Sequence, residues 1–171
     1  FIDQLDSMHG FAYYEPDKDT ITLSRDHAGI KPLYYAEIQE GLVFGSEVKG
    51  MLDKVPGSRK LDNLAASFQS RTGLNPLRNT LFSGIKKLLP GETIVWDIVK
   101  KQISNTKRIY IKPNCNVDFD PNEFKKQLAK AVRRCSIGRR QIGVFLSGGL
   151  DSSVVAYELG KIKNELRTFT N

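Results

Sequence analysis

A short apolar run that ends in a Gly-Gly turn constrains the fold of this chain more than any other feature. Residues 143–153 read Gly-Val-Phe-Leu-Ser-Gly-Gly-Leu-Asp-Ser-Ser, and a helix-like segment follows them. This order predicts a strand, a tight turn at Gly148-Gly149 and a helix that begins at Ser152. Adjacent glycines let the backbone approach an anion closely, and a helix N-terminus adds unpaired N–H groups and a positive dipole end. The run therefore predicts a phosphate site.

The polar side chains of this run support the same interpretation. Ser147, Ser152 and Ser153 supply hydroxyl donors to phosphate oxygens. Asp151 is an acid beside an anion site, a placement that makes sense if a Mg²⁺ ion lies between the two. The bland alternative is an ordinary strand-turn-helix connection in which a serine is the N-cap.

Two well-known loop motifs do not fit the run. The phosphate loop of many kinases needs a Lys after its second Gly, and Phe145 stands where a nucleophile elbow needs Gly. The run instead matches S-G-G-x-D-S and resembles the ATP pyrophosphatase (PP-loop) family. Members of that family cleave ATP between the α and β phosphates.

The charge of the chain is positive but dispersed. The net charge is +7 over 171 residues, and the basic residues form only short pairs such as Lys86-Lys87 and Lys100-Lys101. No aromatic residues are interleaved with them as in a nucleic-acid platform. We therefore expect a solvated basic surface and no nucleic-acid partner, with steering of an anionic nucleotide as a minor alternative.

Other bulk features point to a cytoplasmic protein without a membrane partner. No apolar run approaches the roughly 20 residues of a membrane span. Cys115 and Cys135 are too few for a disulfide framework, and His9 and His27 stand apart from any zinc-type cluster. Phe1 is not an initiating Met, so we expect the chain to be a piece of a longer protein.

The first two thirds of the chain reads as short strands with polar turns. Three hairpins are predicted, and they pair residues 11–14 with 20–24, 31–36 with 42–46, and 92–98 with 101–111. Trp96 is expected to be a packing residue. A short helix is expected at 47–52. A second helix is expected at 61–68, with one apolar face made of Leu61, Leu64, Ala65 and Phe68.

The last third reads as the start of a second domain. Residues 112–116 form the expected boundary, and Asp120-Pro121 opens a helix with an apolar stripe at Phe124, Leu128 and Val132. The strand and helix of the 143–153 run, with a final strand at 166–170, complete a β-α-β unit. The predicted domains are 1–112 and 113–171.

Three upstream segments narrow the resemblance. They are Arg-Asp-His-Ala-Gly-Ile-Lys-Pro-Leu-Tyr-Tyr at 25–35, Phe-Gly-Ser-Glu-Val-Lys at 44–49 and Ile-Lys-Lys-Leu-Leu-Pro-Gly-Glu at 85–92. With the phosphate loop, they resemble the glutamine-dependent (class B type) asparagine synthetases in order and spacing. The resemblance implies an α/β fold (α+β overall). Residues 1–112 would be the C-terminal part of an Ntn-type glutaminase domain, and residues 113–171 the Rossmann-like start of a PP-loop synthetase domain.

The resemblance also implies a reaction and a site. Such ligases convert ATP, aspartate and glutamine into asparagine, AMP, pyrophosphate and glutamate through β-aspartyl-AMP. Leu146 would lie near the adenosine, the serines and glycines would hold phosphates, and Asp151 would help to hold Mg²⁺. The implied ATP-binding set is Leu146, Ser147, Gly148, Gly149, Leu150, Asp151, Ser152 and Ser153.

One departure limits what this chain can do by itself. The nucleophile of the family's glutaminase is an N-terminal Cys, whereas this chain starts with Phe1, and neither Cys115 nor Cys135 inherits that role. No catalytic residue is therefore predicted here, and the isolated chain is expected to be inactive. The expected partners are small molecules, and a homodimer of the full-length form stays open.

Two alternatives remain open at this point. The chain could come from a sister amidotransferase that acts on a sugar acid or forms a β-lactam, because the same ATP loop would serve that chemistry. It could also be a nucleotide-binding module without turnover.

Overall fold

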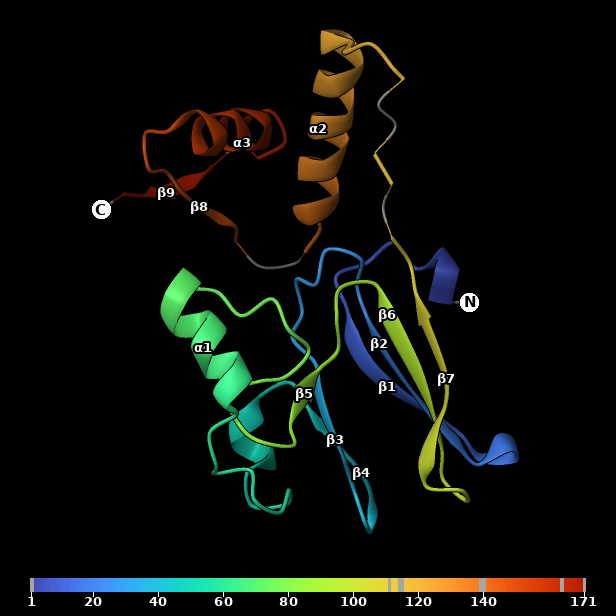
Figure 1. Ribbon diagram of the computed structural model, residues 1–171. Coiled ribbons are helices and arrows are strands. Elements are labelled where there is room, and N and C mark those ends of the chain that lie inside the picture. The colour runs from blue at the N-terminus through green and yellow to red at the C-terminus, as the bar shows by residue number, and fades with distance from the viewer. Residues whose placement is uncertain (1, 111, 114–115, 139–140, 164, 171) are drawn as a thin grey trace. The chain divides into compact units, whose positions relative to one another are not determined.

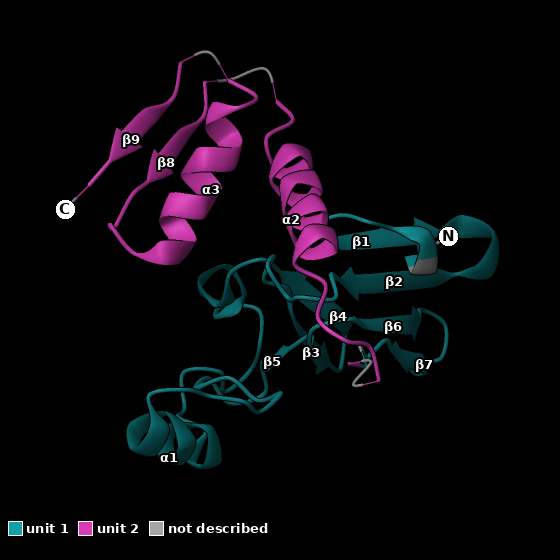
Figure 2. Cartoon of the chain, turned by 90° about the horizontal axis from the view of Figure 1, so that it is seen from above, with its two compact units in different colours: residues 1–112 teal, residues 113–171 magenta. Residues whose placement is uncertain are grey.

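The computed structural model describes residues 2–110, 112–113, 116–138, 141–163 and 165–170. The chain forms two compact units, Phe1–Lys112 and Pro113–Asn171 (Figure 2). The two cysteines were expected not to form a disulfide framework. Cys115 lies outside the described residues, and Cys135 is an exposed free thiol. None of the helices in the described ranges has the length and apolar content needed to cross a membrane.

A four-stranded antiparallel sheet forms one layer of the first unit (Figure 1). Its strands, in order across the sheet, are β1 (Gly10–Glu15), β2 (Thr20–Arg25), β6 (Glu92–Asp97) and β7 (Gln102–Arg108). β1 pairs with β2 and β6 pairs with β7, so two of the predicted hairpins are confirmed. The turn between β1 and β2 is a 3₁₀ helix, η2 (Pro16–Lys18).

The first unit also contains a three-stranded antiparallel sheet, with the strands in the order β4-β3-β5 across the sheet. Its strands are β3 (Tyr34–Ile38), β4 (Gly41–Gly45) and β5 (Lys86–Lys87). β3 pairs with β4 in an antiparallel hairpin, so the third predicted hairpin is also confirmed, although its first strand begins at Tyr34 and not at residue 31. The carboxylate of Asp26 accepts hydrogen bonds from the N–H groups of Ile30 and Lys31, which holds the preceding residues in a loop. The expected helix at 47–52 is the 3₁₀ helix η3 (Val48–Met51).

Residues from both sheets share the core of the first unit. One cluster consists of Leu23, Leu33, Tyr35, Leu88 and Ile94, and a second consists of Ala36, Met51, Val55 and Ile85. Along β6 the buried positions alternate with half-buried ones, as expected for a strand packed on one face. Trp96 is 2% exposed, which confirms that it is a packing residue.

Helix α1 (Asn63–Thr72) forms where helical spacing predicts it, but its apolar face is not buried. The side chain of Asp62 accepts a hydrogen bond from the backbone N–H of Ala65, which caps the helix. The helix starts two residues later than predicted, and Leu61 lies before it in a β-bridge with Phe82. Of the predicted apolar face only Ala65 is buried, while Leu61 and Leu64 are 61% and 58% exposed. The spacing of apolar residues therefore predicted that a helix forms here, but the burial of its apolar face, which the spacing also suggested, is not observed.

The second unit is a β-α-β arrangement with one additional helix. It contains α2 (Pro121–Cys135), β8 (Gly143–Phe145), α3 (Leu150–Gly160) and β9 (Arg167–Phe169), and β8 pairs with β9 in parallel. The Asp120 side chain caps α2, as the Asp-Pro sequence predicts. Val132, Val144 and Leu159 form the core, with Leu128 packed against them. Phe124, at the start of the stripe, is exposed.

Candidate nucleotide-binding site

The loop between β8 and α3 is anchored by the neighbouring strand. The backbone N–H of Leu146 donates to the carbonyl oxygen of Phe169 at 2.8 Å, which carries the pairing of β8 with β9 past the end of the strand. The chain then turns at Ser147 and enters α3 at Leu150. The neighbouring strand therefore anchors one end of the loop, and α3 begins at the other end.

Gly148 has the backbone conformation that makes this turn. Its φ of +79° lies in the left-handed region, where residues other than glycine are strained. Apart from its two chain neighbours, no described residue has a heavy atom within 4 Å of the position that a Cβ would take there. The requirement for glycine is therefore set by the backbone angle, and the face of the turn is open to an approaching ligand.

Three serine hydroxyls converge on this turn. Ser147 Oγ lies 3.1 Å from Ser152 Oγ, so residues on either side of the Gly-Gly pair meet. Ser152 and Ser153 both donate to the carbonyl oxygen of Gly149, at 3.1 and 2.8 Å. The sequence reasoning placed these residues in one loop but did not foresee the contact between Ser147 and Ser152. The sequence signal for this contact is that only four residues separate Ser147 from Ser152, which lie on the two sides of a tight turn.

The helix starts earlier than predicted. Gly149 is the N-cap of α3, and its carbonyl accepts the first helical hydrogen bond, from the N–H of Ser153 at 3.1 Å. The helix therefore begins at Leu150, two residues before the predicted Ser152. Gly149 makes no side-chain cap bond, and the N–H groups of the first turn can therefore donate to an external acceptor, as helix N-termini generally allow. The alternative of an ordinary strand-turn-helix connection expected a serine as the N-cap, whereas the N-cap is Gly149.

The polar groups of the loop are accessible. Ser147, Asp151 and Ser153 are exposed, whereas Leu146 and Ser152 are half-buried. Leu150 is 79% exposed. Hydroxyl groups, backbone N–H groups and the positive end of the helix dipole therefore gather at the turn before α3. Together they can donate hydrogen bonds to an anionic group such as a phosphate and stabilise its charge.

Asp151 is the acid that this loop offers to a metal ion. Among the described residues, no group of three or more His, Cys, Asp and Glu side chains could hold a metal. A Mg²⁺ ion does not need such a cage, because it commonly binds one or two carboxylates together with substrate phosphates and water. A single exposed carboxylate in the first turn of α3 therefore fits an ion that arrives with a phosphate ligand.

Comparison with known families agrees with this division into two units. Residues 1–110 match the glutamine amidotransferase domain, and residues 123–171 match asparagine synthase. The first match covers more than half of the chain, and the second covers most of the second unit. The chain belongs to the glutamine-dependent asparagine synthetase family.

Proteins from bacteria and archaea are similar in sequence to most of this chain. Asparagine synthetase [glutamine-hydrolyzing] 2 of Bacillus subtilis is 27% identical over 190 residues, which cover 99% of this chain and 24% of that protein. A putative asparagine synthetase of Methanocaldococcus jannaschii is 31% identical, over 90% of this chain and 31% of that protein. Asparagine synthetase B of Escherichia coli is 29% identical, over 91% and 24%. The chain thus spans a quarter to a third of the length of these relatives.

Proposed function

We propose that this chain is part of a glutamine-hydrolysing asparagine synthetase and that its 147–153 loop binds the phosphates of ATP. The observation that carries the proposal is the convergence of Ser147, Ser152 and Ser153 on a Gly148 turn at the start of α3. The names of the relatives support the same reaction. The proposed substrates are ATP, aspartate and glutamine, and the proposed compartment is the cytoplasm.

The proposed role of the loop is to stabilise the leaving pyrophosphate. A carboxylate oxygen of aspartate attacks the α-phosphorus, and the bond from that phosphorus to the oxygen bridging the α and β phosphates breaks. Negative charge then builds up on the departing pyrophosphate, where the N–H groups of α3 and the serine hydroxyls can donate hydrogen bonds. Ammonia from glutamine next attacks the acyl carbon of β-aspartyl-AMP and releases AMP.

The proposed role of Asp151 is to bind Mg²⁺ together with the phosphates. A divalent ion between Asp151 and the phosphate oxygens would offset the repulsion between the two anionic groups. The hydroxyls of Ser152 and Ser153 now donate to the Gly149 carbonyl, and rotation about one bond turns each toward a ligand.

The test is exchange of labelled pyrophosphate into ATP by the full-length protein. We expect exchange that requires both Mg²⁺ and aspartate, because formation of β-aspartyl-AMP is reversible. Asp151→Asn should raise the Mg²⁺ concentration for half-maximal exchange by about tenfold, whereas Asp53→Asn, at an exposed surface position, should not change it. Exchange supported by a sugar acid and not by aspartate would overturn the asparagine assignment. ATP binding without exchange for any acceptor would overturn the assignment as a ligase.

A further inference from the structure

A polar cavity lies in the first unit and is lined by none of the residues of the 147–153 loop. Its volume is about 540 Å³, and three of its lining residues are cations, Arg25, Lys87 and Arg108. Arg25 ends β2, Lys87 belongs to β5 and Arg108 ends β7, so three strands bring them together. The other lining residues are uncharged: Tyr34, Pro76, Leu89 and Pro90.

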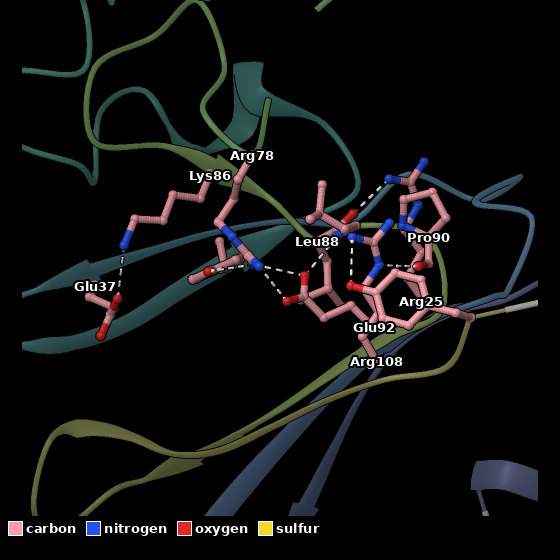
Figure 3. Close-up of polar contacts among 11 residues, drawn as sticks. Arg25, Glu37, Arg78, Lys86, Leu88, Pro90, Glu92 and Arg108 are labelled. Atoms are coloured by element: carbon pink, nitrogen blue, oxygen red, sulfur yellow. Dashed lines mark hydrogen bonds and ion pairs between the residues drawn. The ribbon is translucent and has the colours of Figure 1, made fainter. Parts of the chain in front are cut away.

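Two cations close to this cavity, Arg78 and Lys86, are paired with acids, whereas no acid among the described residues is paired with the three cations that line it. Figure 3 shows the contrast. Arg78 makes two hydrogen bonds to the carboxylate of Glu92, at 2.7 and 2.5 Å, and Lys86 lies 3.2 Å from Glu37. In the part of the chain that the structure describes, the recorded partners of the three lining cations are backbone carbonyls and a tyrosine.

The two arginines are fixed in place by neutral groups. Arg25 donates to the carbonyl oxygens of Lys31, Leu88 and Gly29, at 2.8, 2.7 and 2.6 Å. Arg108 donates to the Pro90 carbonyl at 3.0 Å and lies over the ring of Tyr110, 4.7 Å from its centroid. A guanidinium has five N–H donors, so each arginine keeps donors for a ligand while its position is already set.

Lys87 is crowded by a like charge. Its ammonium donates to the carbonyl of Asn75, which does not neutralise it. Burial, and then the positive charge of Arg25, lower the pKa of Lys87 below its ordinary value. The nearby acids are committed elsewhere: Asp26 to the N–H groups of Ile30 and Lys31, and Glu92 to Arg78 and the N–H of Leu89. An anion in the cavity would relieve this repulsion.

We propose that this cavity binds a phosphate group, either free or carried by a small metabolite. Two planar guanidinium groups and an ammonium suit an oxyanion with several acceptor oxygens and more than one negative charge. The volume is in the range of small-molecule sites and leaves room beyond the phosphate itself. The site does not depend on the proposed ATP loop. Sequence alone grouped Lys86 with Lys87 as solvated surface, whereas the structure pairs Lys86 with Glu37 and directs Lys87 to the cavity.

The test is equilibrium dialysis of the full-length protein with labelled inorganic phosphate. The measurement is made in a Gly148→Val background, so that the loop before α3 contributes as little binding as possible. Lys87→Gln and Lys86→Gln form the matched pair, because they remove the same charge from adjacent residues of one strand. Arg108→Gln is the second variant at the site, and circular dichroism at the assay temperature establishes that each variant is folded.

We expect Lys87→Gln and Arg108→Gln each to weaken phosphate binding by about tenfold or more, and Lys86→Gln to change it by less than about twofold. Stronger displacement of the label by glycerol phosphate than by unlabelled phosphate would identify the ligand as a small phosphate ester, and weaker displacement would identify free phosphate. Absence of saturable binding, or equal losses for Lys86→Gln and Lys87→Gln, would overturn the proposal. Since loop binding is suppressed in every arm, failure here leaves the ATP assignment unaffected.

Discussion

Arg78 and Glu92 join two parts of the first unit through two hydrogen bonds. Arg78 Nη2 lies 2.5 Å from Glu92 Oε1, and Arg78 Nη1 lies 2.7 Å from Glu92 Oε2. Glu92 begins β6 and is 1% exposed, and it also accepts a hydrogen bond from the N–H of Leu89. The carboxylate is therefore buried with every oxygen partnered, and the arginine ties the segment before β5 to the large sheet.

Removing Arg78 should be costly because it leaves a buried charge without its counter-ion. We expect Arg78→Met to lower the free energy of unfolding by about 3–5 kcal/mol. Arg59→Met is the control, because Arg59 pairs with the exposed carboxylate of Asp53, and its effect should be at most about 1 kcal/mol. Chemical denaturation measures both, and equal losses for the two variants would show that the Glu92 pair is no stronger than a surface pair.

Asp26 should make the first unit sensitive to acid. Burial disfavours its charge, but the N–H groups of Lys31 and Ile30 outweigh burial and hold the pKa of Asp26 below its ordinary value. A carboxyl with a lowered pKa in the folded state contributes stability above its unfolded pKa of about 3.9 and loses it as the pH falls further.

Asp26→Asn tests this contribution. We expect the variant to cost about 1–3 kcal/mol at neutral pH, since two hydrogen bonds lose a charged acceptor. The free energy of unfolding of the unmodified protein should fall more steeply below about pH 4 than that of the variant. Parallel pH profiles for the two proteins, measured by urea denaturation, would refute the assignment.

Gly91 should tolerate alanine much less than Gly57 does. Both have a positive φ, +71° and +73°, so each substitution carries similar backbone strain, about 1–2 kcal/mol. A Cβ at Gly91 would also collide with the carbonyl oxygen of Ile109, whereas a Cβ at Gly57 meets nothing within 4 Å. Gly91→Ala should therefore lower the melting temperature by several degrees more than Gly57→Ala. Equal shifts would mean that the turn before β6 relaxes without cost.

Local patterns predicted the strands of this chain well. Apolar alternation and polar turns located the hairpins of β1 with β2 and of β6 with β7, and the Gly-Gly run located the β8–α3 connection. These features depend on neighbouring residues, so a sequence displays them directly. The ATP-binding role of the 147–153 loop stays a prediction.

Features that depend on distant residues were not predictable in the same way. The spacing of Leu64 and Phe68 indicates a helical face but not that both would stay exposed. Arg25 and Lys87 are far apart in the sequence, and only the pairing of β3 with β5 and the folded loops bring them to one cavity. In the sequence the adjacent Lys86 and Lys87 look equivalent, and only the folded structure shows that they have different surroundings.

Calorimetric titration with Mg²⁺-ATP measures whether the 147–153 loop binds the nucleotide. The proteins compared are the full-length protein, Gly148→Val and the matched control Gly57→Val, which introduces the same side chain at a similar φ in another exposed loop. We expect one ATP per chain for the unmodified protein and for Gly57→Val, and at least about tenfold weaker binding for Gly148→Val. Equal ATP affinity in all three proteins would contradict ATP binding by this loop.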